Sequence, residues 1–353
     1  MKIVEETKLD FDDILLVPAR SLAASRKEVQ LERRFKFFHS VKTWDGIPVV
    51  SANMDTTGTF DMGSSLLQQN MVTCLHKYYS AEEIISYFKY YDASPNVWVS
   101  IGMGDHELDK LAEIESQLKY CPNICIDIAN GYTEKFVEWC LNVRANVGKH
   151  PIIMAGNVCT PEMVQELILH GGVDVVKIGI GPGSACTTRL KTGVGYPQLS
   201  AIIECSHAAH GLKSSEKRMG LICADGGCRQ PADVCKAFAA GADFVMLGGM
   251  LAGTHECEGD WQYSNDKKRI GLKFYGMSSK QAQKKHNGGM DNYKTSEGRE
   301  IVVPYKGLAK DVALDVLGGV RSCCAYVGAT SLKDLPKCAK AIKVNRTHFD
   351  KTV

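Results

Sequence analysis

Residues 173–189 read Val-Asp-Val-Val-Lys-Ile-Gly-Ile-Gly-Pro-Gly-Ser-Ala-Cys-Thr-Thr-Arg, an apolar run that continues into a glycine-rich loop. The run is typical of a buried β-strand, and the glycines allow main-chain dihedral angles that other residues rarely adopt. Amides and carbonyls of such a loop can converge on a ligand or an ion. The loop holds one thiol, Cys186, beside two threonines and an arginine, where it can be activated as a nucleophile. The alternative is that Cys186 is small and buried, as most free cysteines are.

Short runs of β-branched and apolar residues recur along the chain. There are eight: Ile47–Ser51, Met71–Leu75, Val97–Ile101, Ile124–Ile128, Ile152–Ala155, Val173–Ile178, Gly220–Ala224 and Phe244–Leu247. Helix-like stretches lie between most of them, at Ala81–Tyr90, Leu108–Leu118, Thr133–Val143, Pro161–His170 and Pro231–Ala239. Alternating strands and helices indicate a parallel sheet, and eight units close a (β/α)8 TIM barrel. A doubly wound open sheet is the alternative, but no Gly-x-Gly-x-x-Gly turn follows the first strand.

The carboxyl ends of the predicted strands are polar or rich in glycine. In a (β/α)8 barrel the active site lies at these ends, so Asn53, Asn157 and Asp225 are placed where function needs polar groups. The last two strands are followed by the pairs Gly226-Gly227 and Gly248-Gly249, in loops that commonly bind phosphate through main-chain amides. We therefore expect a phosphorylated substrate. The alternative is two tight turns without a ligand.

Composition narrows the class of protein. The chain has 353 residues, of which 44% are hydrophobic and 23% charged, with a net charge of +2. That charge does not indicate a nucleic-acid or membrane surface, because both normally need a strong basic field. The start of the chain lacks the apolar core of a signal peptide, and we expect a cytosolic protein. The 14 cysteines are then reduced thiols, and their spacing does not match a zinc site.

About a hundred residues follow the eighth predicted strand. Segment 253–310 contains Phe274-Tyr275-Gly276-Met277-Ser278-Ser279 and Tyr293-Lys294-Thr295-Ser296-Glu297-Gly298, which combine aromatic, small and acidic residues as mobile active-site flaps do. We interpret this segment as a flap on one barrel domain spanning residues 1–353. The stretch after Val327 is expected to form a closing helix and a polar tail.

These motifs together resemble GMP reductases, from the superfamily shared with IMP dehydrogenase. The resemblance runs almost from end to end. It is carried by residues 9–13 (LDFDD), 51–56 (SANMDT), 124–132 (ICIDIANGY), 154–158 (MAGNV), the Cys186 loop, 192–198 (TGVGYPQ), 225–228 (DGGC) and 274–279 (FYGMSS).

The resemblance implies a covalent reaction. Cys186 attacks C2 of the guanine ring of GMP, ammonia departs, and NADPH delivers a hydride to the resulting thioimidate to give IMP. Thr188 and Glu297 form the proton relay for the departing ammonia, because an amide-like nitrogen leaves poorly until it is protonated. Without the resemblance, Glu297 is better interpreted as a surface carboxylate.

The resemblance also implies the binding residues. Those for GMP are Asp225, Gly226, Gly227, Gly248, Gly249, Gly276, Met277, Ser278, Lys294, Thr295, Ser296 and Gly298. Those for NADPH, some of them from a neighbouring subunit, are Ser25, Arg26, Lys77, Asp127, Ile128, Ala129, Ile180, Gly181, Met277, Tyr293, Ser322, Cys323, Cys324 and Ala325. Lys77 and Arg26 would meet the extra phosphate of NADPH. A potassium ion would be held at Gly181, Gly183, Cys186 and Arg189.

Two segments depart from the family pattern. Related reductases usually have Arg-Ala where this chain has Lys294-Thr295, so a bidentate contact to GMP is lost or becomes single. Ser322-Cys323-Cys324-Ala325 replaces a more hydroxyl-rich segment of the cofactor site.

Other functions stay open at this point. IMP dehydrogenase shares the cysteine and the barrel, but its flap is longer and carries an Arg-Tyr pair, whereas residues 277–297 contain no arginine. A phosphate-binding lyase or isomerase leaves the Cys-Thr-Thr loop unexplained. A purine-nucleotide sensor would bind GMP without turnover. By resemblance we expect a homotetramer, which agrees with the general preference for symmetric assemblies.

Overall fold

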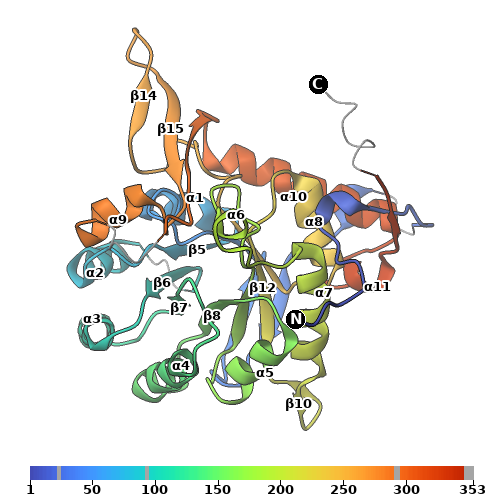
Figure 1. Cartoon of the computed structure of the whole chain (residues 1–353), viewed down its shortest axis with the longest axis horizontal. Coiled ribbons are helices and arrows are strands. Elements are labelled where there is room, and N and C mark those ends of the chain that lie inside the picture. The colour runs from blue at the N-terminus through green and yellow to red at the C-terminus, as the bar shows by residue number, and fades with distance from the viewer. Residues whose placement is uncertain (22–24, 92–94, 290–294, 346–353) are drawn as a thin grey trace.

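A closed barrel of eight parallel strands forms the centre of the molecule (Figure 1). The structure is a computed structural model and describes residues 1–21, 25–91, 95–289 and 295–345. The strands run in the order β4 (Val49–Ser51), β5 (Val72–Leu75), β6 (Val97–Ile101), β7 (Ile124–Asp127), β8 (Ile153–Val158), β9 (Val175–Ile178), β12 (Leu221–Asp225) and β13 (Phe244–Leu247), and β13 pairs with β4. The predicted (β/α)8 fold is confirmed, with every strand bound within three residues of its expected position.

Helices surround the barrel in the figure. They are α1 (Phe60–Leu67), α2 (Ala81–Tyr90), α3 (Asp105–Leu118), α4 (Glu134–Val147), α5 (Pro161–Leu169), α7 (Gln198–Gly211), α8 (Pro231–Ala239) and α10 (Ala309–Val327). Local sequence fixes several helix starts. Ser80 and Glu83 form a reciprocal capping box at α2, and prolines occupy the first turns of α5 and α8.

Alternate strand residues face opposite sides and build two apolar layers. Val175 belongs to the cluster inside the barrel, whereas Val176 and Ile178 pack outward against the helices. Burying one such side chain contributes roughly 1.5–3 kcal/mol. Lys177 is the exception on this strand, because a charged side chain replaces an apolar one at the inward-facing position next to Val175.

Aromatic side chains fill the amino-terminal end of the barrel. The hairpin of β2 (Arg33–Lys36) and β3 (Thr43–Gly46) places Phe35 and Trp44 against Phe244 of β13, with ring centroids 5.0 and 5.3 Å from that of Phe244. Because side chains fill the amino-terminal end of the barrel, a ligand site can form only at the carboxyl end.

Segment 253–310 forms a second, smaller structure on the barrel. Its strands β14 (Trp261–Tyr263), β15 (Arg269–Tyr275) and β16 (Glu300–Pro304) make an antiparallel sheet, and α9 (Lys280–Asn287) lies between β15 and β16 in the chain. The β14–β15 hairpin projects away from the barrel (Figure 1).

In the stretch after Val327 the short helix α11 (Leu335–Cys338) forms, and β17 (Ala341–Lys343), which was not predicted, follows and pairs with β1 (Ile14–Leu16). The end of the expected polar tail, residues 346–353, lies outside the described residues. Three residues carry too little pattern to predict a strand whose partner lies so far away in sequence.

The remaining short elements are η1 (Phe11–Asp13), η2 (Arg26–Glu28), α6 (Thr188–Thr192), β10 (Lys213–Ser214) and β11 (Lys217–Arg218). Among the described residues, no helix has the length and apolar character needed to span a membrane.

Candidate active site

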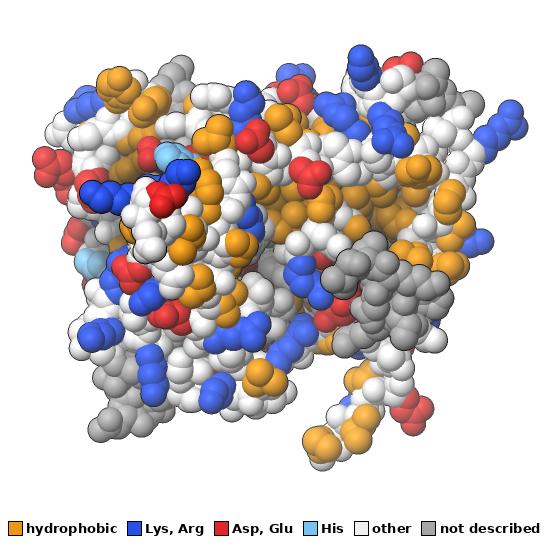
Figure 2. Space-filling model, turned by 90° about the horizontal axis from the view of Figure 1, so that it is seen from above, with side chains coloured by type: hydrophobic (Ala, Val, Ile, Leu, Met, Phe, Trp, Pro, Cys, Tyr) orange, Lys and Arg blue, Asp and Glu red, His pale blue; other side chains and the backbone are white. Residues whose placement is uncertain are grey.

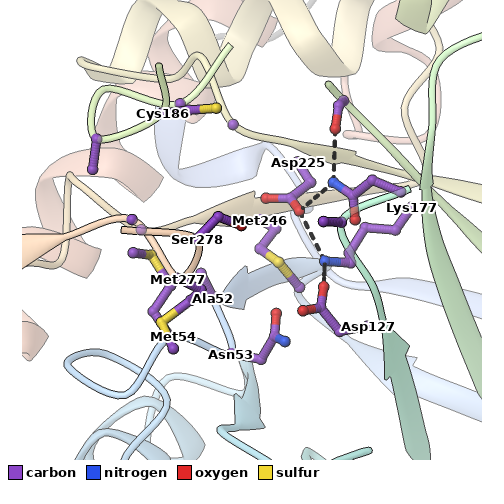
Figure 3. A pocket seen from close by; sticks show the side chains of 18 of the residues that line it. Ala52, Asn53, Met54, Asp127, Lys177, Cys186, Asp225, Met246, Met277 and Ser278 are labelled. Carbon is purple, nitrogen blue, oxygen red and sulfur yellow. Dashed lines mark hydrogen bonds and ion pairs between the residues drawn. The ribbon is translucent and has the colours of Figure 1, made fainter. Parts of the chain in front are cut away.

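A cavity of about 830 Å³ lies at the carboxyl end of the barrel (Figure 3). Residues at or just after the carboxyl ends of all eight barrel strands line it, and they are joined by Gly276, Met277, Ser278 and Glu297 of the segment 253–310. A cavity of this size fits a nucleotide-sized ligand. The prediction that the site lies at these strand ends agrees with this position.

Cys186 lies in the loop after β9, and its thiol begins a chain of polar contacts. The loop turns at Gly181, whose φ of +86° favours glycine, and the Cys186 amide donates to the Gly183 carbonyl at 3.0 Å. Cys186 Sγ lies 3.2 Å from Thr188 Oγ1, and Thr188 Oγ1 donates to Glu297 Oε2 at 2.8 Å. The structure therefore brings together the three residues predicted to be catalytic, in an arrangement that can pass a proton from thiol to carboxylate.

Main-chain contacts hold Glu297 beside the Cys186 loop. Cys186 and Gly298 form an isolated antiparallel bridge, and the Thr187 amide donates to the Glu297 carbonyl at 2.7 Å. A Cβ on Gly276 would stand 2.8 Å from the Ala185 carbonyl oxygen, and one on Gly298 would stand 3.0 Å from the Gly276 Cα. Such backbone approaches require glycine, so Gly276 lets the segment 253–310 approach the loop, and Gly298 lets the two strands of the segment pack on each other.

The two predicted phosphate-binding glycine pairs lie beside the same loop. Gly226 and Gly227 have φ of +90° and +86°, and a Cβ on Gly226 would contact Pro182 at 3.0 Å. A Cβ on Gly249 would lie 2.9 Å from Ser184 Oγ. All four glycines line the cavity, where their exposed main chain can approach a ligand closely.

A buried ion cluster forms the floor of the cavity, and the sequence analysis assigned no role to its centre. Lys177 of β9 donates to Asp127 and, at 3.0 Å, to Asp225 Oδ2. Asn157 donates to the same Asp225 oxygen at 2.9 Å (Figure 3). The signal for Lys177 was present, because a lysine within the apolar run 173–178 is unusual and indicates a buried partner.

Asp55, in the loop after β4, joins the barrel to α9. Its Oδ2 accepts hydrogen bonds from Tyr275 at 2.8 Å, Lys285 at 3.1 Å and His286 at 2.8 Å. Burial alone would raise the pKa of Asp55, but the His286, Lys285 and Tyr275 donors outweigh it and lower the pKa below its ordinary value. His286 also stacks on Tyr78, with 3.4 Å between ring centroids. We call these four residues, Asp55, Tyr275, Lys285 and His286, the flap anchor.

The residues predicted to bind NADPH fall into two groups. The first group lines the cavity and consists of Lys77, Asp127, Ile128, Ala129, Ile180, Gly181 and Met277. Arg26 and Ser322 instead line a separate groove between η2 and α10, and Ser25, Cys323, Cys324 and Ala325 belong to the same two segments rather than to the cavity lining.

The residues predicted to bind GMP are also divided. Asp225, the four paired glycines, Gly276, Met277 and Ser278 line the cavity, whereas Thr295, Ser296 and Gly298 do not. Ser296 instead accepts a hydrogen bond from the Lys280 amide at 3.2 Å, at the start of α9. Tyr293 and Lys294 lie outside the described residues.

The predicted potassium site consists of main-chain oxygens. Gly181, Gly183 and Cys186 line the cavity, and the Gly183 carbonyl already accepts one hydrogen bond, which leaves its second lone pair. The Arg189 side chain lies across Gly181 and donates to the Tyr196 carbonyl at 2.5 Å. Among the described residues, no group of three His, Cys, Asp or Glu side chains is placed to hold a metal ion.

Comparison with known proteins places these features in a family. A family model described as "IMP dehydrogenase / GMP reductase domain" matches residues 8–351. The chain is 52% identical to GMP reductase 1 of Homo sapiens over 98% of each chain. It is 50% identical to GMP reductase of Shewanella pealeana, over 98% of this chain and 97% of the relative. An inosine 5′-monophosphate dehydrogenase crystal structure from Legionella pneumophila superposes with a TM-score of 0.80 at 34% identity, over 97% of this chain and 99% of that chain.

The flap anchor predicts how α9 stays docked. Replacing Asp55 with Ala removes the shared acceptor of three donors, and each hydrogen bond to a charged group contributes about 1.5–3 kcal/mol. Trypsin should therefore cut at the exposed Lys284 and Lys285 at least about tenfold faster than in the unmodified protein, because local opening limits cleavage.

Asp260→Ala is the matched control for this prediction. Asp260 is exposed and lies 3.9 Å from Lys273 on the same segment, so its removal should leave the cleavage rate unchanged. Equal rates in the Asp55 variant and the control, followed by mass spectrometry of the fragments, would contradict the anchor.

Proposed function

The chain belongs to the IMP dehydrogenase / GMP reductase family, and from that premise we propose how its cavity carries out the chemistry of a GMP reductase. The activity is the reductive deamination of GMP to IMP. The observation that carries the proposal is the contact chain from Cys186 Sγ through Thr188 Oγ1 to Glu297 Oε2, with steps of 3.2 and 2.8 Å, at the wall of the nucleotide-sized cavity.

The first step uses this chain to activate the thiol. The Cys186 proton passes through the Thr188 hydroxyl to the Glu297 carboxylate, and the thiolate forms a bond to C2 of guanine. Glu297 then holds the proton that the exocyclic amino group needs in order to leave as ammonia. Loss of ammonia leaves C2 bonded to Cys186 as a thioimidate. The same carboxylate thus acts as base and then as acid, and no further residue is required for the transfer.

The second step resolves the covalent bond. NADPH, when bound, would supply a hydride for C2, and the electron pair of the carbon–sulfur bond would return to Cys186 as IMP forms. Glu297 has by then given its proton to ammonia, so solvent supplies the proton that returns through Glu297 and Thr188 to the thiolate. Closure of Gly276 and Gly298 onto the loop keeps bulk water from the thioimidate, which would otherwise hydrolyse.

GMP would be held at both of its ends. Amides of the paired glycines 226–227 and 248–249 bind the phosphate, and Asp225 accepts from the ribose hydroxyls. Met277 and Ser278 line the wall near Cys186 and would contact the base. Lys294 lies outside the described residues, and Thr295, Ser296 and Gly298 would support the flap rather than touch GMP.

The residues for NADPH fit the cofactor if two subunits share it. The carboxylate and main chain of Asp127–Ala129 would hold the nicotinamide half in the cavity of one subunit, along with Ile180, Gly181 and Met277. Lys77, which also lines the cavity, would meet the extra phosphate of NADPH. The groove of a neighbouring subunit would supply Arg26 and Arg321, which are cationic and suited to phosphate groups, together with Ser25 and Ser322–Ala325.

A homotetramer would bring together the two parts of the NADPH site that lie on different subunits. Hydrophobic side chains gather on the face seen from above (Figure 2). On α10, Leu314 and Tyr326 are 48% and 59% exposed. Leu314 also lines the cationic groove. An exposed apolar surface beside a half-site is typical of an interface between copies of one chain.

Potassium would use oxygen donors only. Main-chain carbonyls of Gly181, Gly183, Cys186 and Arg189 are the ligand type that an alkali cation accepts, and a bound ion would restrain the Cys186 loop. We propose that the enzyme works in the cytoplasm, where thiols remain reduced. All 14 cysteines lie in the described part of the chain as free thiols.

Two absorbance assays test the proposed function. Purified protein with GMP and NADPH should oxidise NADPH and produce IMP and ammonia in equal amounts. Protein with IMP, NAD+ and potassium should not form XMP. Reduction of NAD+ with XMP as product would instead make the chain an IMP dehydrogenase, and GMP binding without turnover would make it a sensor.

Replacing Cys186 with Ala tests the covalent step. Turnover should fall by at least about 10⁴-fold, the scale lost when a nucleophile is removed from a catalytic unit, while the Kd for GMP stays within about threefold. Cys228→Ala is the control, because Cys228 also lines the cavity but burial raises the pKa of its thiol well above the ordinary value. Robust turnover by the Cys186 variant would overturn the mechanism.

Replacing Glu297 with Gln separates the two halves of the reaction. GMP-dependent NADPH oxidation should fall by about 10²–10⁴-fold, since the amino group loses its proton donor. The single burst of NADPH formed from IMP and NADP+ needs the Cys186 thiolate but no proton for ammonia, so its rate should fall at least about tenfold less. Glu300→Gln on the exposed strand β16 serves as the control. Similar losses in both steps would remove the assigned role of Glu297.

A further inference from the structure

Lys177 occupies the centre of the cavity floor and is almost completely buried. Its side chain is 2% exposed, and its ammonium group contacts carboxylates from two other strands, Asp127 of β7 and Asp225 of β12. Figure 3 shows the ammonium between these carboxylates. Asn157 of β8 in turn donates to Asp225. Three strands of the barrel thus meet at one charge, and a fourth supports one of its partners.

The charge is retained in spite of its burial. Burial works against the ammonium form, but Asp127 and Asp225 outweigh it and raise the pKa of Lys177 well above its ordinary value. The effect is reciprocal for Asp127: burial opposes its ionisation, and Lys177, then Lys77, lower its pKa below the ordinary value. Lys177 therefore stays an ammonium and Asp127 a carboxylate at neutral pH.

The fold itself does not require a lysine at this position. The neighbouring inward-facing residues of the barrel are apolar, including Val175, Cys125 and Cys223. Buried ion pairs are often replaceable by apolar residues of similar volume without loss of stability, whereas breaking one by removing a single partner is costly. A buried lysine at the boundary between core and cavity therefore points to a role in the cavity.

Asp225 keeps one carboxylate oxygen available for a ligand, and Asp127, which Asn53 also contacts, keeps part of its side chain exposed to the cavity. Asp225 receives both Lys177 and Asn157 on Oδ2, and its other oxygen points away from Lys177 (Figure 3). Asp127 and Asp225 line the cavity and are 23% and 20% exposed, in contrast to Lys177. The lysine thus holds both carboxylates from behind while their remaining surface faces the ligand space.

We infer that Lys177 is a positioning residue shared by the two ligands, which fixes Asp225 for the substrate ribose and Asp127 for the cofactor. The inference rests on the proposed function for the assignment of the two carboxylates. Because one ammonium holds both, its loss weakens binding of both ligands, whereas loss of either carboxylate weakens one. Lys177 touches neither ligand in this arrangement and acts through the orientation of the carboxylates.

The test measures the Kd of GMP, and the Kd of NADP+ with GMP saturating, by calorimetry on the intact protein. Lys177→Met should raise both constants at least about tenfold, since a charged partner left unpaired loses its orientation. Asp225→Asn should raise the Kd of GMP. Asp127→Asn should raise the Kd of NADP+ and leave that of GMP unchanged. Lys177→Arg should recover part of both affinities, because the guanidinium keeps the charge but not the geometry.

The double variant Lys177→Met with Asp127→Asn separates positioning from stability. It removes the repulsion between two unpaired carboxylates, and Asn157 still holds Asp225, so GMP affinity should return to within about threefold of the unmodified protein while NADP+ binding stays weak. Thermal unfolding of each variant shows which of them are folded.

Three results would overturn the inference. They are unchanged affinities in the folded Lys177→Met protein, loss of one ligand only, or a double variant that binds GMP no better than the single one. Failure of the proposed function looks different, because the unmodified protein would then not bind GMP or would not oxidise NADPH with it.

Discussion

The close approach of two glycines to the Cys186 loop is the contact on which the site depends. Gly276 brings the segment 253–310 to the main chain of Ala185 at a distance that a Cβ would not allow, and Gly298, which packs equally closely on Gly276, forms a main-chain bridge with Cys186. Glu297 precedes Gly298 and is thereby held against Thr188, while Met277 and Ser278 follow Gly276 and are held against the cavity. A thiol on the barrel and a carboxylate on the flap are joined in one chain of polar contacts only through this backbone contact.

Charge in the cavity is organised around the same division between barrel and flap. On the barrel side, Lys177 neutralises part of the carboxylate charge at the floor, so two acidic residues can face ligands that themselves carry phosphate. Where barrel and flap meet, Asp55 of the barrel gathers three donors from β15 and α9, among them the ammonium of Lys285. The buried carboxylates are thus paired at the cavity floor and at the junction with α9, and the cavity lies between these two groups.

Local patterns account for what the sequence analysis could predict. The eight strand runs are apolar and short, and helix starts carry Ser80 or proline, so strands and helices are determined within windows of about ten residues. The Cys186 loop can be recognised from local sequence, because glycines and a thiol are adjacent in it. Glu297 needed the family resemblance, since nothing in its neighbourhood indicates that it meets Thr188, which is 109 residues away.

Contacts between distant segments explain what was missed. Lys177 lies 50 residues from Asp127 and 48 from Asp225, and Asp55 lies 220 from Tyr275, so no local pattern joins them. The groove of Arg26 and Ser322 likewise requires η2 to meet α10. Because this groove lies outside the cavity, the residues predicted to bind NADPH do not all line one site of a single chain.

Pairing of the first barrel strand with the last has a consequence for how the protein is made. One edge of strand β4 (Val49–Ser51) pairs with Val245, Met246 and Leu247 of β13. The rings of Phe35 and Trp44 contact Phe244 of the same late strand. While the ribosome is still translating the intervening segment, β4 is an unpaired strand edge, and the rings of Phe35 and Trp44 lack the barrel strand on which they pack. Exposed edges and rings of this kind promote aggregation and attract chaperones. Nascent chains interrupted before residue 247 should therefore be prone to aggregation. Closing the barrel pairs the open edge of β4 and covers the aromatic rings, and so removes this tendency.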